Sequence, residues 1–173
     1  MILRPATIDD IPALTRLSHD SFVEKFGHLY KPEDLALFVR DYRTEARYRE
    51  HLADPATLIQ LAEEHGTLLG YCLIIRGDSF EQRPPPFPER PVILSQLYCA
   101  SGATGRGIGG KLMEWALSEA RAWGADVVQL SVYSENFEAQ KFYFRHGFEK
   151  VADIDFWVGN HRDDEFLFEL ALG

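Results

Sequence analysis

A glycine-rich segment has the clearest chemical meaning in this sequence. Residues 105–111 read GRGIGGK and lie between an apolar stretch and a segment with helical periodicity. A turn that opens a helix directs unpaired backbone N–H groups at one point, and the helix dipole adds positive potential there. Glycines allow an anion to approach the backbone, and Arg106 and Lys111 can add charge. The segment therefore predicts a binding site for a phosphate-bearing ligand.

Two nucleotide-binding motifs also match this segment, but the surrounding sequence does not support them. Gly105, Gly107 and Gly110 satisfy G-x-G-x-x-G, yet the 63 residues after Gly110 are too few to complete a doubly wound fold. The pattern G-x-x-x-x-G-K is present too, but Leu112 stands where a phosphate loop needs Ser or Thr to reach its metal. A nucleotide-binding protein is kept as an alternative that titration with ATP or NADH would test.

A second segment gives the glycine-rich turn its context. Residues 130–148 read LSVYSENFEAQKFYFRHGF, in which Asn136 can cap a helix and Gly147 can end it. With ATGRGIGGKLM at 103–113, this segment resembles the GNAT superfamily of acetyl-CoA-dependent N-acetyltransferases. Gly107 and Gly109 match the small positions of its pyrophosphate loop, and Thr104 replaces the usual Arg or Gln. The second motif is matched by Leu130, Val132, Asn136, Ala139, Phe142, Tyr143, Gly147 and Phe148.

The resemblance implies acetyl-CoA as co-substrate and assigns its contacts. The glycine turn would bind the pyrophosphate through backbone amides. A bulged strand at residues 97–99 would hold the pantetheine arm and polarise the thioester carbonyl, and Asn136 would contact the same arm. The acetyl-CoA contacts expected from the resemblance are Leu97, Tyr98, Cys99, Thr104, Gly105, Arg106, Gly107, Ile108, Gly109, Gly110, Lys111, Asn136 and Tyr143.

Acetyl transfer requires a neutral amine, a donor for the developing oxyanion and stabilisation of the departing thiolate. The resemblance makes Tyr143 the general acid, because a phenol with a pKa near 10 is protonated at neutral pH and can donate to a thiolate. The general base stays open. Gln96 stands where many relatives place Glu, so the amine arrives neutral or a water chain reaches another group. The candidates are His19, Glu24, Asp78 and Glu135.

The expected acceptor is a primary amine that attacks directly in a ternary complex. Residues 19–42 and 156–170 resemble, more loosely, the spermidine/spermine acetyltransferase branch, which implies a polyamine or another small cationic amine. The residues expected to bind it are Glu24, Tyr30, Asp34, Gln96 and Trp157. Amino acids, peptide N-termini, protein lysines and drug amines stay open as acceptors. The alternative function is a non-catalytic acyl-CoA-binding sensor or interaction module.

The elements that must position these residues follow from hydrophobic periodicity. Helices are predicted from Asp9 or Asp10 to Phe26, from Pro32 to Leu52, over residues 107–123 and from Asn136 to Gly147. Strands are predicted at 2–6, 58–63, 68–76, 92–99, 127–133, 148–158 and 166–172, with an exposed proline-rich loop at 77–91. These elements predict an α/β (α+β) fold with one mixed, mostly antiparallel sheet of about seven strands and about four helices, in a single domain over 1–173. The resemblance implies that this is the GNAT fold.

Composition restricts the partners. The chain has a net charge of −9, which disfavours nucleic acid as a ligand. The two cysteines, Cys72 and Cys99, lie in apolar stretches and predict neither a disulfide framework nor a metal site. Cys99 is expected to be a core thiol rather than a nucleophile. No apolar run approaches a membrane span and the N-terminus does not resemble a signal peptide, so the expected location is cytoplasmic, with a homodimer as a candidate assembly.

Overall fold

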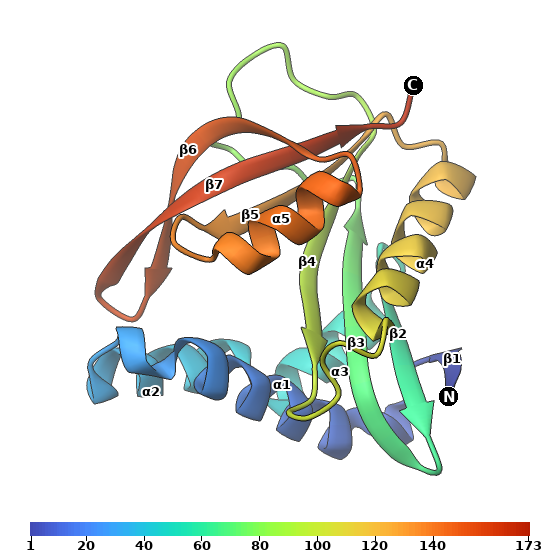
Figure 1. Cartoon of the computed structure of the whole chain (residues 1–173), viewed down its shortest axis with the longest axis vertical. Coiled ribbons are helices and arrows are strands. Elements are labelled where there is room, and N and C mark those ends of the chain that lie inside the picture. The colour runs from blue at the N-terminus through green and yellow to red at the C-terminus, as the bar shows by residue number, and fades with distance from the viewer.

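A mixed seven-stranded sheet forms the centre of the computed structural model, which describes all residues 1–173. The strands are β1 (Ile2–Pro5), β2 (Thr57–Glu64), β3 (Thr67–Arg76), β4 (Pro91–Cys99), β5 (Val127–Tyr133), β6 (Glu149–Val158) and β7 (His161–Ala171). Their order is β1-β2-β3-β4-β5-β7-β6, and only β4 and β5 pair in parallel (Figure 1). This confirms the predicted mixed α/β fold. It is not a doubly wound sheet, so the dinucleotide motif lacks its fold.

Five α-helices accompany the sheet: α1 (Ile11–Phe26), α2 (Pro32–Tyr42), α3 (Glu45–Ala53), α4 (Ile108–Trp123) and α5 (Phe137–Arg145). Side chains alternate between the faces of β3: Cys72 and Ile74 join the core under α4, whereas Tyr71 and Leu73 join the core under α1 and α3. The sheet is therefore covered on both sides. None of the helices is long and apolar enough to cross a membrane.

The helix predicted from Pro32 to Leu52 is two helices. Arg43 leaves the helical region with φ −120° and ψ 56°, and Thr44 caps α3 by accepting a hydrogen bond from the Arg47 amide at 3.3 Å. The apolar periodicity continues across this break, so the pattern alone did not reveal it. The break matters because it turns the Arg43 side chain inward, where it is 9% exposed.

The strand predicted at 166–172 begins earlier, at His161, because the polar residues 161–165 pair with β6. The turn between β6 and β7 lies against the first turn of α2. Asp34 accepts a hydrogen bond from the Asn160 amide at 2.8 Å, and a Cβ on Gly159 would lie 2.6 Å from the Asp34 Cα atom. The C-terminal strand pair is thereby held against the helical side of the molecule.

β4 and β5 separate after three paired residues. Their ladder covers Pro91–Ile93 and Val127–Gln129, and beyond it β5 turns away from β4 together with β7 and β6 (Figure 1). β4 also bulges, because Gln96 lies opposite Leu73 while Leu94 lies opposite Ile74, which leaves Ser95 as the extra residue. The sequence predicted a bulge at 97–99. The register there is regular, and the irregularity lies at Ser95, where β4 leaves β5.

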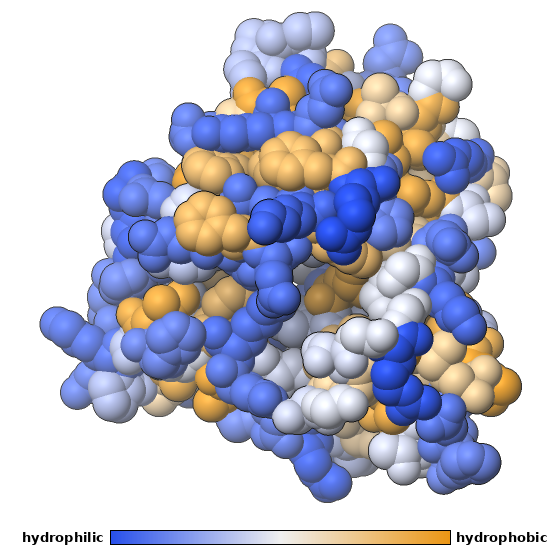
Figure 2. Space-filling model, in the orientation of Figure 1, coloured by the Kyte–Doolittle hydropathy of each residue, from blue (hydrophilic) through white to orange (hydrophobic).

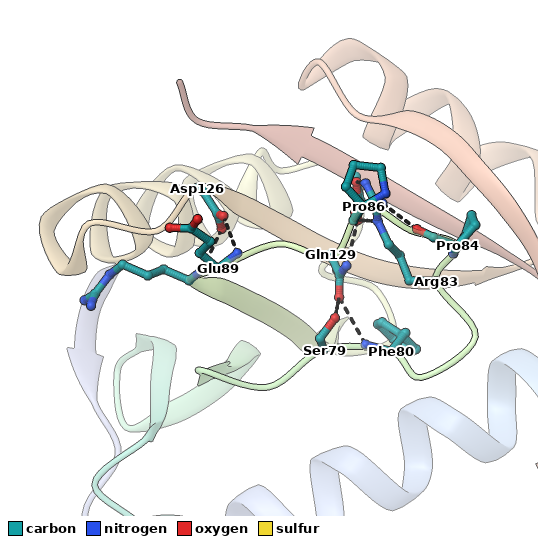
Figure 3. Close-up of polar contacts among 10 residues, drawn as sticks. Ser79, Phe80, Arg83, Pro84, Pro86, Glu89, Asp126 and Gln129 are labelled. Atoms are coloured by element: carbon teal, nitrogen blue, oxygen red, sulfur yellow. Dashed lines mark hydrogen bonds and ion pairs between the residues drawn. The ribbon is translucent and has the colours of Figure 1, made fainter.

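The proline-rich loop at 77–91 is fastened to the sheet rather than free. The Gln129 side chain accepts hydrogen bonds from Ser79 Oγ at 3.0 Å and from the Phe80 amide at 3.1 Å (Figure 3). Arg83 donates to both carboxylate oxygens of Glu169 at 2.8 Å, and both side chains are largely buried. The loop therefore covers the end of the sheet where β4 and β5 are still paired.

Candidate functional site

The separation of β4 from β5 opens a cavity of about 130 Å³ through the sheet. This central cavity is lined by α1, β4, β5, α5 and β7, with Leu97, Tyr98, Ser131, Tyr143 and Glu165 among its residues. Figure 2 shows the face carrying α5 hollowed between α5 and the turn that precedes α4, with apolar atoms at the base of the hollow. A strand pair that ends early exposes backbone groups to a ligand that a continuous sheet would cover.

The glycine-rich turn lies at the N-terminus of α4. Gly107 has φ 76°, a left-handed conformation that favours glycine, and the helix begins at Ile108. A Cβ on Gly105, Gly107 or Gly110 would meet no atom within 4 Å, so the turn has open space around it. The first amides of α4 lack intrahelical acceptors and carry the positive end of the helix dipole. These features fit a pyrophosphate group.

The side chains of the turn differ in their freedom to contact an anion. Arg106 is held by Glu64, its Nη2 lying 3.0 and 2.8 Å from the two carboxylate oxygens. The Arg106 guanidinium next to Glu64 lowers the pKa of that carboxyl group. Thr104 and Lys111 are exposed. The backbone of the turn, supplemented by Lys111, is therefore better placed for an anion than the Arg106 side chain.

α5 presents Tyr143 to the central cavity. Asn136 Oδ1 accepts from the Ala139 amide at 3.2 Å, which confirms the predicted cap and fixes where the helix begins. The Tyr143 ring packs edge-on against Phe148 and Phe168, with centroids 5.8 and 6.4 Å away. Burial raises the pKa of Tyr143, so its hydroxyl stays protonated throughout the neutral range. It can therefore act as a proton donor.

Glu165 is a cavity residue that the sequence analysis missed. It lies on β7 opposite Tyr133 of β5, and it is 9% exposed. Burial, followed by the negative charge of Asp163, raises the pKa of Glu165 to about 8, while a hydrogen bond from Ser131 acts in the opposite direction. A carboxyl group with such a pKa is mostly protonated at pH 7 and becomes able to accept a proton as the pH approaches 8. Alternation along residues 161–167 would have revealed it if that stretch had been read as a strand.

Tyr143 and Glu165 belong to opposite faces of the sheet. Tyr143 packs on Phe168, whereas Glu165 alternates with Phe168 along β7 and points to the other side. Both line the same cavity because β4 and β5 are not joined there. The arrangement places a proton donor and a proton acceptor on either side of an opening through the sheet, and two reactants can meet there from opposite faces.

The four base candidates from the sequence all lie outside the central cavity lining. Each makes a hydrogen bond elsewhere in the protein: His19 with Asp20, Glu24 with Ser101, Asp78 with the Ser79 amide, and Glu135 with Tyr133. Gln96 is buried, and its Oε1 accepts hydrogen bonds from Tyr48 and Tyr71 at 2.8 and 2.9 Å. The side chain at this position therefore joins a tyrosine network rather than accepting a proton.

The residues expected to bind the acceptor are dispersed. Tyr30 lines the central cavity and donates to Asp163 at 2.5 Å, whereas Trp157 is 56% exposed and lies elsewhere. Glu24 is exposed and accepts from Ser101, and Asp34 is engaged by the Asn160 amide. Gln96 and Trp157 both line a second, larger cavity. The structure thus does not bring the five residues together around one cation.

The second cavity has a volume of about 390 Å³. Its lining includes Tyr42, Arg43, Arg47, His51, Gln96 and Trp157, and it shares Arg43, Ser95 and Phe156 with the central cavity. The sequence analysis gave no role to Arg43, Arg47 or His51. A pattern of apolar residues gives no signal for them, because their position depends on the break between α2 and α3.

Cys99 and its neighbours on β4 lie beside the glycine turn. Leu97, Tyr98 and Cys99 are all partly buried, and the Gly109 amide points at the Cys99 sulfur. Burial raises the pKa of the Cys99 thiol, which reduces the thiolate fraction at neutral pH. These properties agree with the expectation that Cys99 packs rather than attacks.

Comparison with known proteins identifies the family. Residues 13–148 match the model of the acetyltransferase (GNAT) family. An uncharacterised N-acetyltransferase of Mycobacterium tuberculosis (strain ATCC 25618 / H37Rv) is 36% identical over 141 residues, covering 82% of this chain and 84% of the relative. Another, encoded in the pepI 3′ region of Lactobacillus delbrueckii subsp. lactis, is 26% identical over 163 residues, covering 94% and 92%.

Solved structures of other proteins share this fold. The PaiA N-acetyltransferase of Thermoplasma acidophilum, solved in complex with coenzyme A, superposes with a TM-score of 0.78 at 19% identity and covers 98% of each chain. The sequence comparisons and the shared fold agree, and the chain belongs to the GNAT family of N-acetyltransferases.

Proposed function

We propose that this protein transfers the acetyl group of acetyl-CoA to a primary amine by direct attack in a ternary complex. The observation that carries the proposal is the central cavity, which joins the glycine turn side of the sheet to the opposite face and holds both Tyr143 and Glu165. An acyl donor and an acceptor can approach such an opening from different sides. Family membership supports the reaction class.

Acetyl-CoA fits the residues on one face. The amides at the start of α4 and Lys111 would hold its pyrophosphate. The backbone of residues 97–99, which no longer pairs with β5, would hold the pantetheine arm. Coenzyme A bound to the related PaiA protein is consistent with this assignment. When bound, acetyl-CoA supplies the thioester carbon that the amine attacks.

Glu165 and Tyr143 are proposed as base and acid. Glu165 would accept the proton of the incoming ammonium, because its pKa of about 8 lies between those of an ordinary carboxylic acid and an alkylamine. Tyr143 would donate a hydrogen bond or its proton toward the departing sulfur, since its hydroxyl keeps its proton at neutral pH. With Gln96 bound to Tyr48 and Tyr71, the base comes from β7 instead of β4.

The acceptor is proposed here only as a primary amine. A polyamine or other small cationic amine was the expectation from the sequence, and it stays a prediction. Of its expected ligands, Glu24 and Asp34 are already hydrogen-bonded within the protein, and Tyr30 donates to Asp163. A non-catalytic acyl-CoA-binding module is the alternative, and it differs in having no acetyl transfer.

Calorimetric titration with acetyl-CoA, with separate titrations of ATP and NADH, tests the ligand. Release of the CoA thiol in the presence of amines then tests transfer. Tyr143→Phe and Glu165→Gln should each lower kcat by about 100-fold or more, because a positioned acid or base contributes on that scale. Acetyl-CoA affinity should hardly change in Glu165→Gln. Binding without transfer to any amine would support the non-catalytic alternative, and no binding of acetyl-CoA would refute the proposal.

The pH profile of activity distinguishes the loss of a general base in Glu165→Gln from a general structural defect. The kcat/KM of the wild-type protein should rise with pH through about 8, because Glu165 must lose its proton before it can accept one. Glu165→Gln should lose this ionisation and keep only the one that belongs to the amine substrate. An unchanged profile in Glu165→Gln would remove Glu165 from the role of base.

A further inference from the structure

The second cavity lies next to the site of the proposed reaction. It lies between α2, α3, β4 and β6, and it meets the central cavity at Arg43, Ser95 and Phe156. Ser95 is the bulged residue of β4 and is exposed at this point. A molecule that fills the second cavity therefore lies next to the central cavity, where Glu165 is found. This position suits an acceptor that approaches from the side of the sheet opposite the glycine turn.

Arg43 stands at the junction without a carboxylate partner. It is 9% exposed, and none of the ion pairs in the protein includes it. Its Nε has no hydrogen-bond partner, Nη1 donates to the Tyr42 carbonyl over a long 3.5 Å, and the Tyr98 hydroxyl is the neutral polar group beside the guanidinium. The guanidinium instead packs over the rings of Phe22 and Phe38, 5.3 and 5.1 Å from their centroids. A buried guanidinium without an anion is costly unless something binds to it.

The charges around Arg43 leave the second cavity positive. Arg47 lies in the first turn of α3 and lines the same cavity, with Nη1 3.0 Å from Glu50. The carboxylate in the lining is Asp155, and it is already paired with Arg162 at 2.7 Å. His51 also lines the cavity and contributes no negative charge. Two guanidinium groups thus face a space in which the acidic residue is already paired.

We propose that the acceptor is a small amine that also carries an anionic group, most simply a carboxylate, and that Arg43 binds this group. The planar fork of a guanidinium matches a carboxylate or a phosphate with two parallel hydrogen bonds. With the anion held at the junction, the amine reaches the central cavity while the rest of the molecule occupies the second cavity. This inference rests on the proposed acetyl transfer and names its substrate class, and it disfavours a polyamine.

Matched acceptors test the inference. The kcat/KM for acetylation is measured for L-phenylalanine, L-phenylalaninamide and 2-phenylethylamine, with spermidine as the cationic acceptor. L-Phenylalanine should be preferred by about tenfold to a hundredfold, the range expected for a hydrogen-bonded charged group. The amide is a strict comparison because its less basic amine is more largely neutral near pH 7, so protonation of the amine would favour the amide and not the acid. β-Alanine against 2-aminoethylphosphonate distinguishes a carboxylate from a phosphate-type anion.

Substitutions test whether the preference for the acid over the amide depends on Arg43. Arg43→Gln should abolish the preference for the acid over the amide, and Arg43→Lys, which keeps the charge but loses the fork, should retain part of it. Arg40→Gln is the matched control, because Arg40 is exposed on α2, pairs with Asp41 and lines neither cavity. Circular dichroism and thermal unfolding show whether each variant is folded. Calorimetric binding of the same amines, with and without CoA, gives a readout that does not need turnover.

Each result decides the question. A preference for anionic amines that disappears in Arg43→Gln and persists in Arg40→Gln would support the inference. Equal use of acid, amide and amine, a preference for spermidine, or binding of anionic amines that is unchanged in Arg43→Gln would overturn it and leave acetyl transfer intact. Failure to bind acetyl-CoA would refute the proposed function instead, and the amine titrations would still show whether Arg43 binds an anion.

Discussion

Replacing Glu165 by glutamine should make the protein more stable at alkaline pH, although the residue lies in the proposed active site. The pKa of Glu165 is raised from 4.5 to about 8 in the native state, chiefly by burial. Between these two pH values the unfolded chain has released a proton that the native state retains. The free energy of unfolding therefore falls as pH rises through this interval, and it is lowest above pH 8.

The size of the effect follows from the same two values. Each pH unit over which native and unfolded states differ by one proton changes the free energy of unfolding by about 1.4 kcal/mol. Across the interval from 4.5 to about 8 the loss is up to about 5 kcal/mol. Glutamine has nearly the same volume and does not ionise. Glu165→Gln should thus match the wild-type protein near pH 5 and exceed its stability by several kcal/mol at pH 8.5.

Urea denaturation followed by tryptophan fluorescence at pH 5.5, 7.0 and 8.5 measures this difference, since the chain has 3 tryptophans. Glu149→Gln, at the exposed start of β6, is the control and should change stability little at all three pH values. The reasoning would be refuted by a difference between Glu165→Gln and wild type that stays constant with pH. Such a result would mean that Glu165 ionises normally and is poorly suited to accept a proton from an amine.

Further substitutions test the geometry of two glycine turns and of one largely buried ion pair. Gly107→Ala should destabilise by about 1–2 kcal/mol in thermal unfolding and weaken acetyl-CoA binding in calorimetry, because φ is 76° there; unchanged values would contradict the turn geometry. Gly159→Ala should destabilise more than Gly107→Ala, since its Cβ would lie 2.6 Å from the Asp34 Cα atom. Arg83→Met should cost about 3 kcal/mol by removing the cationic partner of Glu169, to which Gln129 still donates a hydrogen bond. Adding Glu169→Met should recover much of that loss, and equal single and double variants would argue against the ion pair.

Much of the fold was predictable because its signals are local. Alternation identified the strands, the Asn136 cap fixed the start of α5, and glycines marked the turn before α4. The two motifs identified the family, since they report backbone geometry that neighbouring residues impose. The break at Arg43 was not predictable in this way. Apolar spacing continues through residues 32–52, and the Thr44 cap was the one local sign of a new helix. In the structure α2 packs against β6, whereas α3 packs against α1 and β2.

The proposed proton acceptor and the proposed acceptor pocket depend on contacts between distant segments. Glu165 has a raised pKa because β5, β6 and β7 assemble around it, more than 60 residues beyond the β4 strand that shares the cavity. Gln96 stands where a base was expected, but its engagement by Tyr48 and Tyr71 became evident only in three dimensions. Nothing in the sequence distinguishes Arg43 from the other arginines, and its proposed binding role follows from its burial in the tertiary structure.

The sequence by itself therefore determined the family, the glycine turn and the helix that carries Tyr143, because these follow from short-range backbone geometry and periodicity. Only the tertiary structure decided which carboxylate is protonated near neutral pH and which guanidinium lacks a partner. The raised pKa and the unpaired guanidinium both come from desolvation and from charges on other elements. Neither desolvation nor these charges can be inferred from neighbours along the chain.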